Sequence, residues 1–219
     1  MSARVKICGL RDAATLRQMD GLPVHEIGFV FAKSRRQVTP GQAAELIAEA
    51  ARLRCADGRP PRTVGVFVDH GPEELRALLR TAPLDMLQLH GSESPEACRA
   101  IREATGKDVW KVFPIRGDEK ESAAGRIAPY AGAVDGIMID TAGGGTGTAF
   151  DWSVIGDYKK AAEAIGVPLY VAGGLHADNV AGLTSLYAPD GVDVSSGVET
   201  DGVKDITKIR TFAERVRAR

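Results

Sequence analysis

Two residues able to move protons stand at the ends of two short apolar segments that lie far apart in the sequence. The run Val5–Gly9 (VKICG) carries Cys8 at the end of the first segment, and the run Gly136–Asp140 (GIMID) carries Asp140 at the end of the second. If both segments are parallel strands of one barrel, their carboxyl ends meet at the same mouth. A thiol and a carboxyl group would then face each other there, as a general base faces a general acid.

Each group needs a shifted pKa for this task. A cysteine acts as a base only if its pKa falls from ~8.5 toward neutrality, which requires nearby positive charge or helix-end N–H groups. Strand alternation leads us to expect that Lys6 points outward. The sequence therefore does not identify a positively charged group that would lower the pKa of Cys8. An aspartate acts as an acid only if desolvation or a nearby anion raises its pKa. The alternatives are a small buried apolar role for Cys8 and a turn or N-cap role for Asp140.

Glycine-rich and serine-bearing segments late in the chain favour binding of a phosphate group. Glycine lets backbone N–H groups approach an anion closely, and a short helix that begins there would aim its positive end at the anion. The run from Thr141 to Thr148 is expected to form a lid or a second arm of this site. Tight turns and a flexible connector are the alternatives. The predicted phosphate-binding residues are Gly144, Gly145, Gly147, Gly173, Gly174, Ser195, Ser196 and Gly197.

Polar side chains near other strand ends are candidates for secondary contacts with a ligand. One arginine of the run Ser34–Gln37 (SRRQ), aimed inward, would form a fork for a carboxylate, whereas a solvated basic turn is the alternative. Gln88 and His90 end the fourth apolar segment, and Asp193 precedes the serine pair. A lone histidine is more often a structural hydrogen-bonding group than a catalyst.

The elements that must position these groups alternate along the chain, since each apolar segment is followed by helical periodicity. The expected strands are Val5–Cys8, Glu26–Phe31, Thr63–Asp69, Met86–His90, Val109–Pro114, Gly136–Asp140, Leu169–Ala172 and Val192–Ser195. The expected helices are Ala13–Met19, Pro40–Leu53, Pro72–Arg80, Pro95–Thr105, Lys120–Ile127, Trp152–Ile165, Asn179–Tyr187 and Ile206–Val216.

This alternation, without a run of consecutive strands, implies a parallel sheet. An open doubly wound sheet usually carries a glycine-rich phosphate turn after its first strand, and here the glycine-rich segments come late. We therefore predict an α/β fold, a single eight-stranded parallel (βα)8 TIM barrel, with residues 1–219 as one domain. The polar run Cys55–Pro61 is expected to be a loop at the base of the barrel, where chemistry is not expected.

Composition and charge restrict the function further. The 28 basic and 29 acidic residues nearly cancel, so no strong field favours nucleic acid or an anionic membrane. No apolar run approaches the roughly 20 residues that span a bilayer, and the first strand leaves no room for a signal peptide. Three cysteines without CxxC spacing predict neither a disulfide framework nor a zinc site. We expect a cytoplasmic protein without nucleic-acid or membrane partners.

Taken together, these motifs resemble those of the phosphoribosylanthranilate isomerases. KICG, QLHG, FDW and DVSSGVE, in this order, are specific as a set, although each alone is weak. The matching stretches are Val5–Gly9, Gly28–Phe31, Ser34–Pro40, Val64–Val68, Leu87–Gly91, Asp140–Thr141, Gly144–Trp152, Gly173–Leu175 and Gly191–Glu199.

The resemblance implies a (βα)8 barrel that catalyses an Amadori rearrangement, the third step from anthranilate in tryptophan biosynthesis. It implies that Cys8 is the general base, that Asp140 is the general acid, and that Arg36 holds the anthranilate carboxylate. The GGTG, GG and SSG segments would hold the phosphate. The implied partner is a small phosphosugar substrate, with no cofactor and no metal, and the chain would be a monomer or a homodimer.

Three features depart from the usual family pattern. Gln37 stands where an aromatic residue is common, and Thr148 stands where a lysine is frequent. The run Glu199–Lys204 lacks a common proline and looks shortened. These departures leave the acid and the base in place but weaken the placement of secondary contacts.

Other functions on the same scaffold fit the residues less well. The histidine-pathway isomerase resembles a design with aspartate at the end of strand one, where this chain has Cys8. Indole-glycerol-phosphate synthase would present a catalytic lysine near strand two or three. A metal-dependent epimerase needs clustered ligands, and the four histidines are scattered. A phosphosugar-binding barrel without catalysis is disfavoured because both Cys8 and Asp140 are present.

Overall fold

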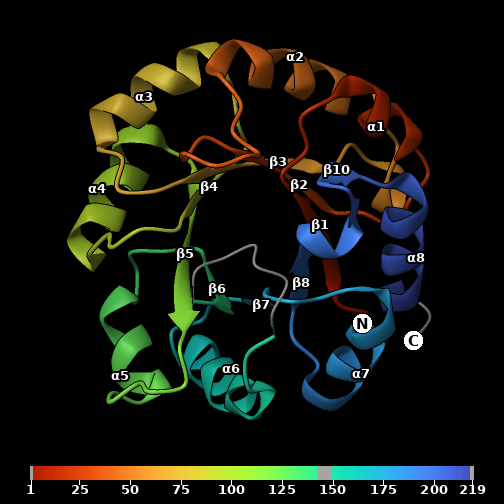
Figure 1. Ribbon diagram of the computed structural model, residues 1–219. Helices are drawn as coiled ribbons and strands as arrows, with labels where there is room; N and C mark the ends of the chain where they lie inside the picture. The colour runs from red at the N-terminus through yellow and green to blue at the C-terminus, as the bar shows by residue number, and fades with distance from the viewer. Residues whose placement is uncertain (1, 143–148, 218–219) are drawn as a thin grey trace.

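The computed structural model describes residues 2–142 and 149–217, and it shows a closed barrel of eight parallel strands surrounded by helices (Figure 1). Each strand pairs with the next, and the eighth returns to the first. The predicted barrel is confirmed, and the strand bounds differ from the expected ones by only one or two residues. The strands are β1 (Arg4–Cys8), β2 (Glu26–Val30), β3 (Arg62–Phe67), β4 (Met86–Leu89), β5 (Asp108–Ile115), β6 (Gly136–Thr141), β7 (Leu169–Val171) and β8 (Gly191–Val194).

Helices begin where the side chains can cap them. Thr39 and Gln42 form a reciprocal capping box before Pro40, and Ser94 accepts from the Ala97 N–H before Pro95. The expected helix at Lys120 begins later because Ser122 caps it. The helices are α1 (Ala13–Gln18), α2 (Pro40–Ala50), α3 (Pro72–Thr81), α4 (Pro95–Thr105), α5 (Ala123–Ile127), α6 (Ile155–Ala164), α7 (Ala177–Tyr187) and α8 (Ile206–Arg217).

Short elements complete the connections. The expected helix at Trp152 begins as a 3-10 turn, η3 (Trp152–Val154), before α6. Two more such turns are η2 (Ala128–Tyr130) and η4 (Ser196–Val198). The expected base loop contains η1 (Ala56–Gly58), between α2 and β3. A two-stranded hairpin of β9 (Glu199–Thr200) and β10 (Val203–Lys204), which the sequence did not lead us to expect, follows η4.

The core has two parts because strand residues alternate between the barrel interior and the helical layer. The larger part lies between strands and helices. The smaller part fills the interior, where the Trp110 and Tyr170 rings lie with centroids 4.3 Å apart. Its members are Val64, Met86, Trp110, Val112, Met138, Tyr170 and Ala172. Three buried polar side chains, Gln88, Asp140 and Asp193, lie toward the carboxyl ends of their strands. None of the helices in the described ranges is long and apolar enough to cross a membrane.

Candidate active site

A cavity of about 600 Å³ opens at the carboxyl ends of the strands. Cys8 enters it from β1 and Asp140 enters it from β6, so the thiol and the carboxyl group share one cavity. Its polar lining includes Cys8, Arg36, Gln88, His90, Asp140, Asp193 and Ser195. The strands therefore bring together, around one cavity, side chains from distant parts of the sequence.

Lys6 lies fully buried beside Cys8, and the expectation that it points outward is wrong. Residues two apart on a strand share a face, so Lys6 and Cys8 both point into the barrel. The Lys6 Nζ lies 3.0 Å from Asp193 Oδ1 at the end of β8. Gly28 on β2 makes room for this group, because a Cβ there would lie 2.8 Å from the Cys8 Sγ and 3.1 Å from the Lys6 Nζ.

The protonation of Cys8 reflects opposing influences. Burial is the largest of them and raises the pKa of the Cys8 thiol above its ordinary value. The Lys6 and Lys204 ammonium groups lower that pKa, whereas Asp193 raises it. Burial is the dominant influence, so the pKa of the thiol lies above its ordinary value, whereas the role of a base requires this pKa to fall. The two ammonium groups stand ready to stabilise a thiolate once it forms.

Asp140 is a buried carboxyl group, only 7% exposed. Burial raises the pKa of Asp140 to about 7, and the neighbouring Asp193 adds to the rise. Gln88 lies near it in the same cavity, and two atoms, Asp140 Oδ1 and Gln88 Oε1, have no hydrogen-bond partner among the described residues. A carboxyl group in this state can donate a proton near neutral pH.

His90 stands next to Asp140 without forming an ion pair with it. Its Nε2 lies 3.6 Å from Asp140 Oδ2, which is too long for a good hydrogen bond. Burial lowers the pKa of His90 to about 4, and Lys111 adds to the lowering. The imidazole is therefore neutral at pH 7, and it leaves the Asp140 proton in place.

Arg36, rather than Arg35, is the arginine that turns toward the cavity. The Arg36 side chain is 11% exposed and lines the cavity, whereas the Arg35 side chain is 59% exposed. Arg36 crosses directly over Gly9, where a Cβ would lie 2.6 Å from its Cδ. Gly9 also has a φ of +80°, a conformation that favours glycine. The glycine after Cys8 thus allows the close approach of Arg36.

Two of the glycine- and serine-bearing segments come together at the mouth. Ser195 Oγ donates to the Cys8 carbonyl oxygen at 3.1 Å. A Cβ on Gly173 would lie 3.0 Å from Asp140 Oδ1, and one on Gly197 would collide with the Leu175 carbonyl oxygen. Gly173 therefore lies beside the proposed acid and Ser195 beside the proposed base, and Gly174, Ser196 and Gly197 follow them in the chain. Gly144, Gly145 and Gly147 lie outside the described residues.

Sequence reasoning missed Glu199 and Lys204, which face each other across the β9–β10 hairpin. The Lys204 Nζ donates to Glu199 Oε1 at 2.8 Å and to the Ser195 carbonyl oxygen at 2.8 Å. The pair Asp201-Gly202 between two short segments is a hairpin signal that could have indicated this turn. Within the described ranges, no group of three or more histidine, cysteine, aspartate or glutamate side chains is arranged to hold a metal ion.

Comparisons with known proteins agree with this geometry. Residues 5–215 match the family model described as N-(5'phosphoribosyl)anthranilate (PRA) isomerase. The N-(5'-phosphoribosyl)anthranilate isomerase of Brevibacillus brevis is 44% identical over 219 residues, which cover 98% of this chain and 94% of the relative. That of Bacillus subtilis is 32% identical, with coverage of 97% and 94%.

Solved structures give the same result. The phosphoribosyl anthranilate isomerase from Thermotoga maritima superposes with a TM-score of 0.81 at 31% identity, covering 99% of this chain and 100% of its own. A structure of such an isomerase in complex with reduced 1-(o-carboxyphenylamino)-1-deoxyribulose 5-phosphate gives a TM-score of 0.78 at 31% identity, with coverage of 99% and 100%.

Proposed function

Because the chain belongs to the N-(5'-phosphoribosyl)anthranilate isomerase family, we propose how its cavity residues divide the work of that reaction. The reaction is an Amadori rearrangement in tryptophan biosynthesis. The aminoaldose N-(5-phosphoribosyl)anthranilate becomes the aminoketose 1-(2-carboxyphenylamino)-1-deoxyribulose 5-phosphate. The observation that carries the proposal is that Cys8 from β1 and Asp140 from β6 line one cavity.

Asp140 acts first, as the general acid. Its proton passes to the furanose ring oxygen, the bond from that oxygen to C1′ breaks, and the nitrogen lone pair forms a Schiff base. The raised pKa of Asp140, about 7, supports this role because a large fraction of the group is protonated near neutral pH. Neutral His90 beside it does not take the proton.

Cys8 acts second, as the general base. Its thiolate takes the proton from C2′, and the electrons of that C–H bond form the enolamine, which tautomerises to the ketone. The thiol first passes its own proton to solvent at the open mouth of the cavity, and Lys6 and Lys204 favour the thiolate that results. Asp193 contributes by holding Lys6 in place under the thiol.

The remaining residues hold the two anionic ends of the substrate. Arg36 binds the anthranilate carboxylate, and Gln88 and His90 make secondary contacts with the sugar. Holding both ends positions the sugar between acid and base, which supplies much of the rate enhancement. The scheme calls on no cofactor or metal. The phosphate lies against Gly173, Gly174, Ser195, Ser196 and Gly197, with Gly144, Gly145 and Gly147 as a second arm.

We further propose that residues 1–219 form one domain that works in the cytoplasm without nucleic-acid or membrane partners. The closed eight-stranded barrel supports a single unit. The chain would be a monomer or a homodimer, and a similar isomerase from Thermotoga maritima is described as dimeric, with monomers generated from it. Light scattering at several protein concentrations distinguishes the two states.

A fluorescence assay tests the division of roles. The protein is mixed with phosphoribosylanthranilate, and loss of the anthranilate-type fluorescence is followed for the wild type, Cys8→Ser and Asp140→Asn. We expect each substitution to remove most turnover, by about 10²-fold or more, while the reduced product analogue still binds. Wild-type rates in either variant would refute the role assigned to that residue.

A further inference from the structure

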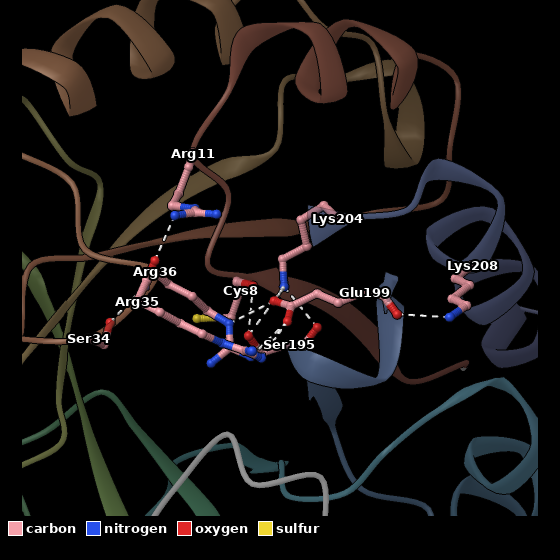
Figure 2. A network of polar contacts seen from close by, with 9 residues as sticks. All are labelled: Cys8, Arg11, Ser34, Arg35, Arg36, Ser195, Glu199, Lys204 and Lys208. Carbon is pink, nitrogen blue, oxygen red and sulfur yellow. Dashed lines mark hydrogen bonds and ion pairs between the residues drawn. The ribbon is translucent and has the colours of Figure 1, made fainter. Parts of the chain in front are cut away.

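Glu199 is the centre of a polar network that joins the connection after β2 to the hairpin after β8, beside Cys8 of the intervening β1 (Figure 2). Its carboxylate is buried, with 5% of the side chain exposed. It accepts from Arg36 Nε at 2.7 Å and from Arg36 Nη2 at 2.9 Å, and from Arg35 Nη2 and Lys204 Nζ at 2.8 Å each. Arg36 belongs to the connection after β2, and Glu199 begins the hairpin after β8. Their contact therefore joins two connections on either side of β1, which lies between β8 and β2 in the barrel.

The network carries more positive than negative charge. Three cations surround one carboxylate, which leaves a net charge of about +2 beside the cavity. Burial alone would raise the pKa of Glu199, but the hydrogen bonds from Arg36 and Lys204 outweigh it and bring that pKa to about 2. Glu199 therefore remains an anion at neutral pH, and the surplus positive charge can receive a second anion.

The hairpin holds Glu199 itself in place. Lys204 ties its carboxylate to the Ser195 carbonyl oxygen, and the Lys208 Nζ donates to the Glu199 carbonyl oxygen at 2.8 Å. On the other side, Arg11 Nη1 donates to the Arg35 carbonyl oxygen at 2.6 Å and steadies the connection after β2. Contacts from outside the cavity thus fix both Glu199 and the connection that carries Arg36.

The guanidinium of Arg36 presents two different edges. The edge formed by Nε and Nη2 is occupied by both oxygens of Glu199, as in a side-on, bidentate ion pair. The end-on edge, which includes Nη1, makes no hydrogen bond with any of the described residues. Because Arg36 lines the cavity, this second edge is the one available to a ligand.

We propose that Glu199 is a positioning residue that holds Arg36 by one edge so that the other edge receives the carboxylate of the substrate's aromatic ring. The inference rests on the proposed role of Arg36, and it makes the β9–β10 hairpin a determinant of selectivity for ligands that carry this carboxylate. A purely structural contact between the two connections predicts no such selectivity.

The test measures binding of two ligands to Glu199→Gln. One is the reduced 1-(2-carboxyphenylamino)-1-deoxyribulose 5-phosphate, and the other is its phenylamino counterpart without the carboxylate. We expect affinity for the first to fall about tenfold and affinity for the second to change less than about twofold, because only the first uses Arg36. KM for the substrate should rise by a similar factor, while kcat stays within about threefold.

Glu49→Gln is the matched control. Glu49 accepts from Arg17 Nε at 3.0 Å and from Arg17 Nη2 at 3.2 Å, so its loss breaks a similar arginine fork on the outer helices. We expect it to leave both ligand affinities unchanged. Arg36→Lys provides a second route, because a lysine cannot be held as a fork. Arg36→Lys should reproduce the selective loss of affinity for the ligand that carries the carboxylate. Adding Glu199→Gln to Arg36→Lys should lower that affinity by less than about twofold more.

Three results would overturn the inference. One is an equal loss of affinity for both ligands in Glu199→Gln. Another is a loss of affinity in the double variant that equals the product of the losses in Glu199→Gln and Arg36→Lys. The third is tighter binding of the carboxylate ligand, which would mean that Glu199 competes with the substrate for Arg36. The proposed role of Arg36 fails separately if Arg36→Ala does not distinguish the two ligands.

Discussion

Two buried carboxyl groups, Glu26 and Asp140, lie at opposite ends of the barrel and meet different surroundings. At the amino end of β2, Glu26 forms an ion pair with Arg4, whose Nε also donates to the Tyr170 hydroxyl at 3.0 Å. At the carboxyl end of β6, Asp140 faces only neutral His90 within ion-pair distance among the described residues. Burial raises the pKa of both groups, and Arg4 opposes the rise at Glu26.

The difference shows how one scaffold separates stability from chemistry. At the floor, the Glu26 pair links β1, β2 and β7 through Arg4 and Tyr170, so loss of either charged partner would leave the other unpaired at this end of the barrel. At the mouth, Asp140 has no cationic side chain within ion-pair distance among the described residues, and Lys6 only weakly opposes the rise of its pKa. This arrangement costs stability and yields an acid that is protonated near neutral pH. The comparison therefore predicts opposite consequences when either carboxyl group is made an amide.

The largest expected effect is on turnover. Asp140→Asn should lower kcat by about 10²–10⁴-fold because it removes the transferable proton, and it should leave the protein at least as stable at pH 8. Glu26→Gln should lower the unfolding free energy by about 1–3 kcal/mol, because Arg4 loses its ionic partner, and keep kcat within about twofold. Steady-state kinetics and urea unfolding of both variants check this contrast. Similar losses of kcat in Asp140→Asn and Glu26→Gln would contradict this contrast between the two carboxyl groups.

The next effect is a pH dependence of stability. Because the folded-state pKa of Asp140, about 7, lies above its ordinary value of 3.8, its contribution to stability is complete below about pH 3.8 and is lost as the pH rises through about 7. Asp140→Asn lacks this loss. Its stability relative to the wild type should therefore grow by roughly 2–4 kcal/mol between pH 4 and pH 8. A constant difference across that range would show that Asp140 is ionised in the folded protein.

A smaller effect concerns the thiol at the mouth. Lys6→Met should raise the pH midpoint of Cys8 alkylation, because it removes the ammonium group that lowers the pKa of the thiol most. Arg4→Met at the floor should leave that midpoint unchanged. Mass spectrometry of the Cys8 peptide after timed alkylation gives the midpoint and distinguishes alkylation of Cys8 from that of Cys55 and Cys98. An unchanged midpoint in Lys6→Met would show that Lys6 does not favour the Cys8 thiolate.

The smallest effects come from two glycines with positive φ. Gly173→Ala would place a Cβ 2.4 Å from Thr141 Oγ1, 2.6 Å from the Thr141 backbone N and 3.0 Å from Asp140 Oδ1. The end of β6 that carries Asp140 must then shift, so kcat/KM should fall about tenfold. Gly106, which ends α4 on the floor side, has open space around the added Cβ. Gly106→Ala should cost about 1 kcal/mol of stability and leave kcat/KM unchanged. Equal effects on kcat/KM would show that the position of Gly173 has no bearing on the acid.

Much of the fold and part of the site could be predicted because their signals are local. Strand and helix alternation is present in the sequence itself, and Cys8 and Asp140 end their strands, so the barrel brings them to one mouth. The error at Lys6 is also local. Alternation places residues two apart on the same face, and that rule, applied to Cys8 and Lys6 together, would have put the ammonium group beside the thiol.

Other features depend on contacts that no local pattern records. Arg36 and Glu199 are separated by 163 positions, so their ion pair is visible only after the barrel closes. The shifted pKa of Asp140 requires the burial and the neighbouring Asp193 that folding creates. The hairpin that carries Glu199 has two strands of only two residues each, which is too short for a periodic pattern in the sequence.

The most direct test of the contrast between floor and mouth is a pH titration of the side-chain carboxyl carbons by ¹³C NMR. Spectra of Asp140→Asn and Glu26→Gln identify the two signals in the wild type. We predict that the Asp140 carboxyl titrates with a midpoint near pH 7. A midpoint below about 5 would contradict the account, because Asp140 would then be ionised at neutral pH and could not serve as the acid.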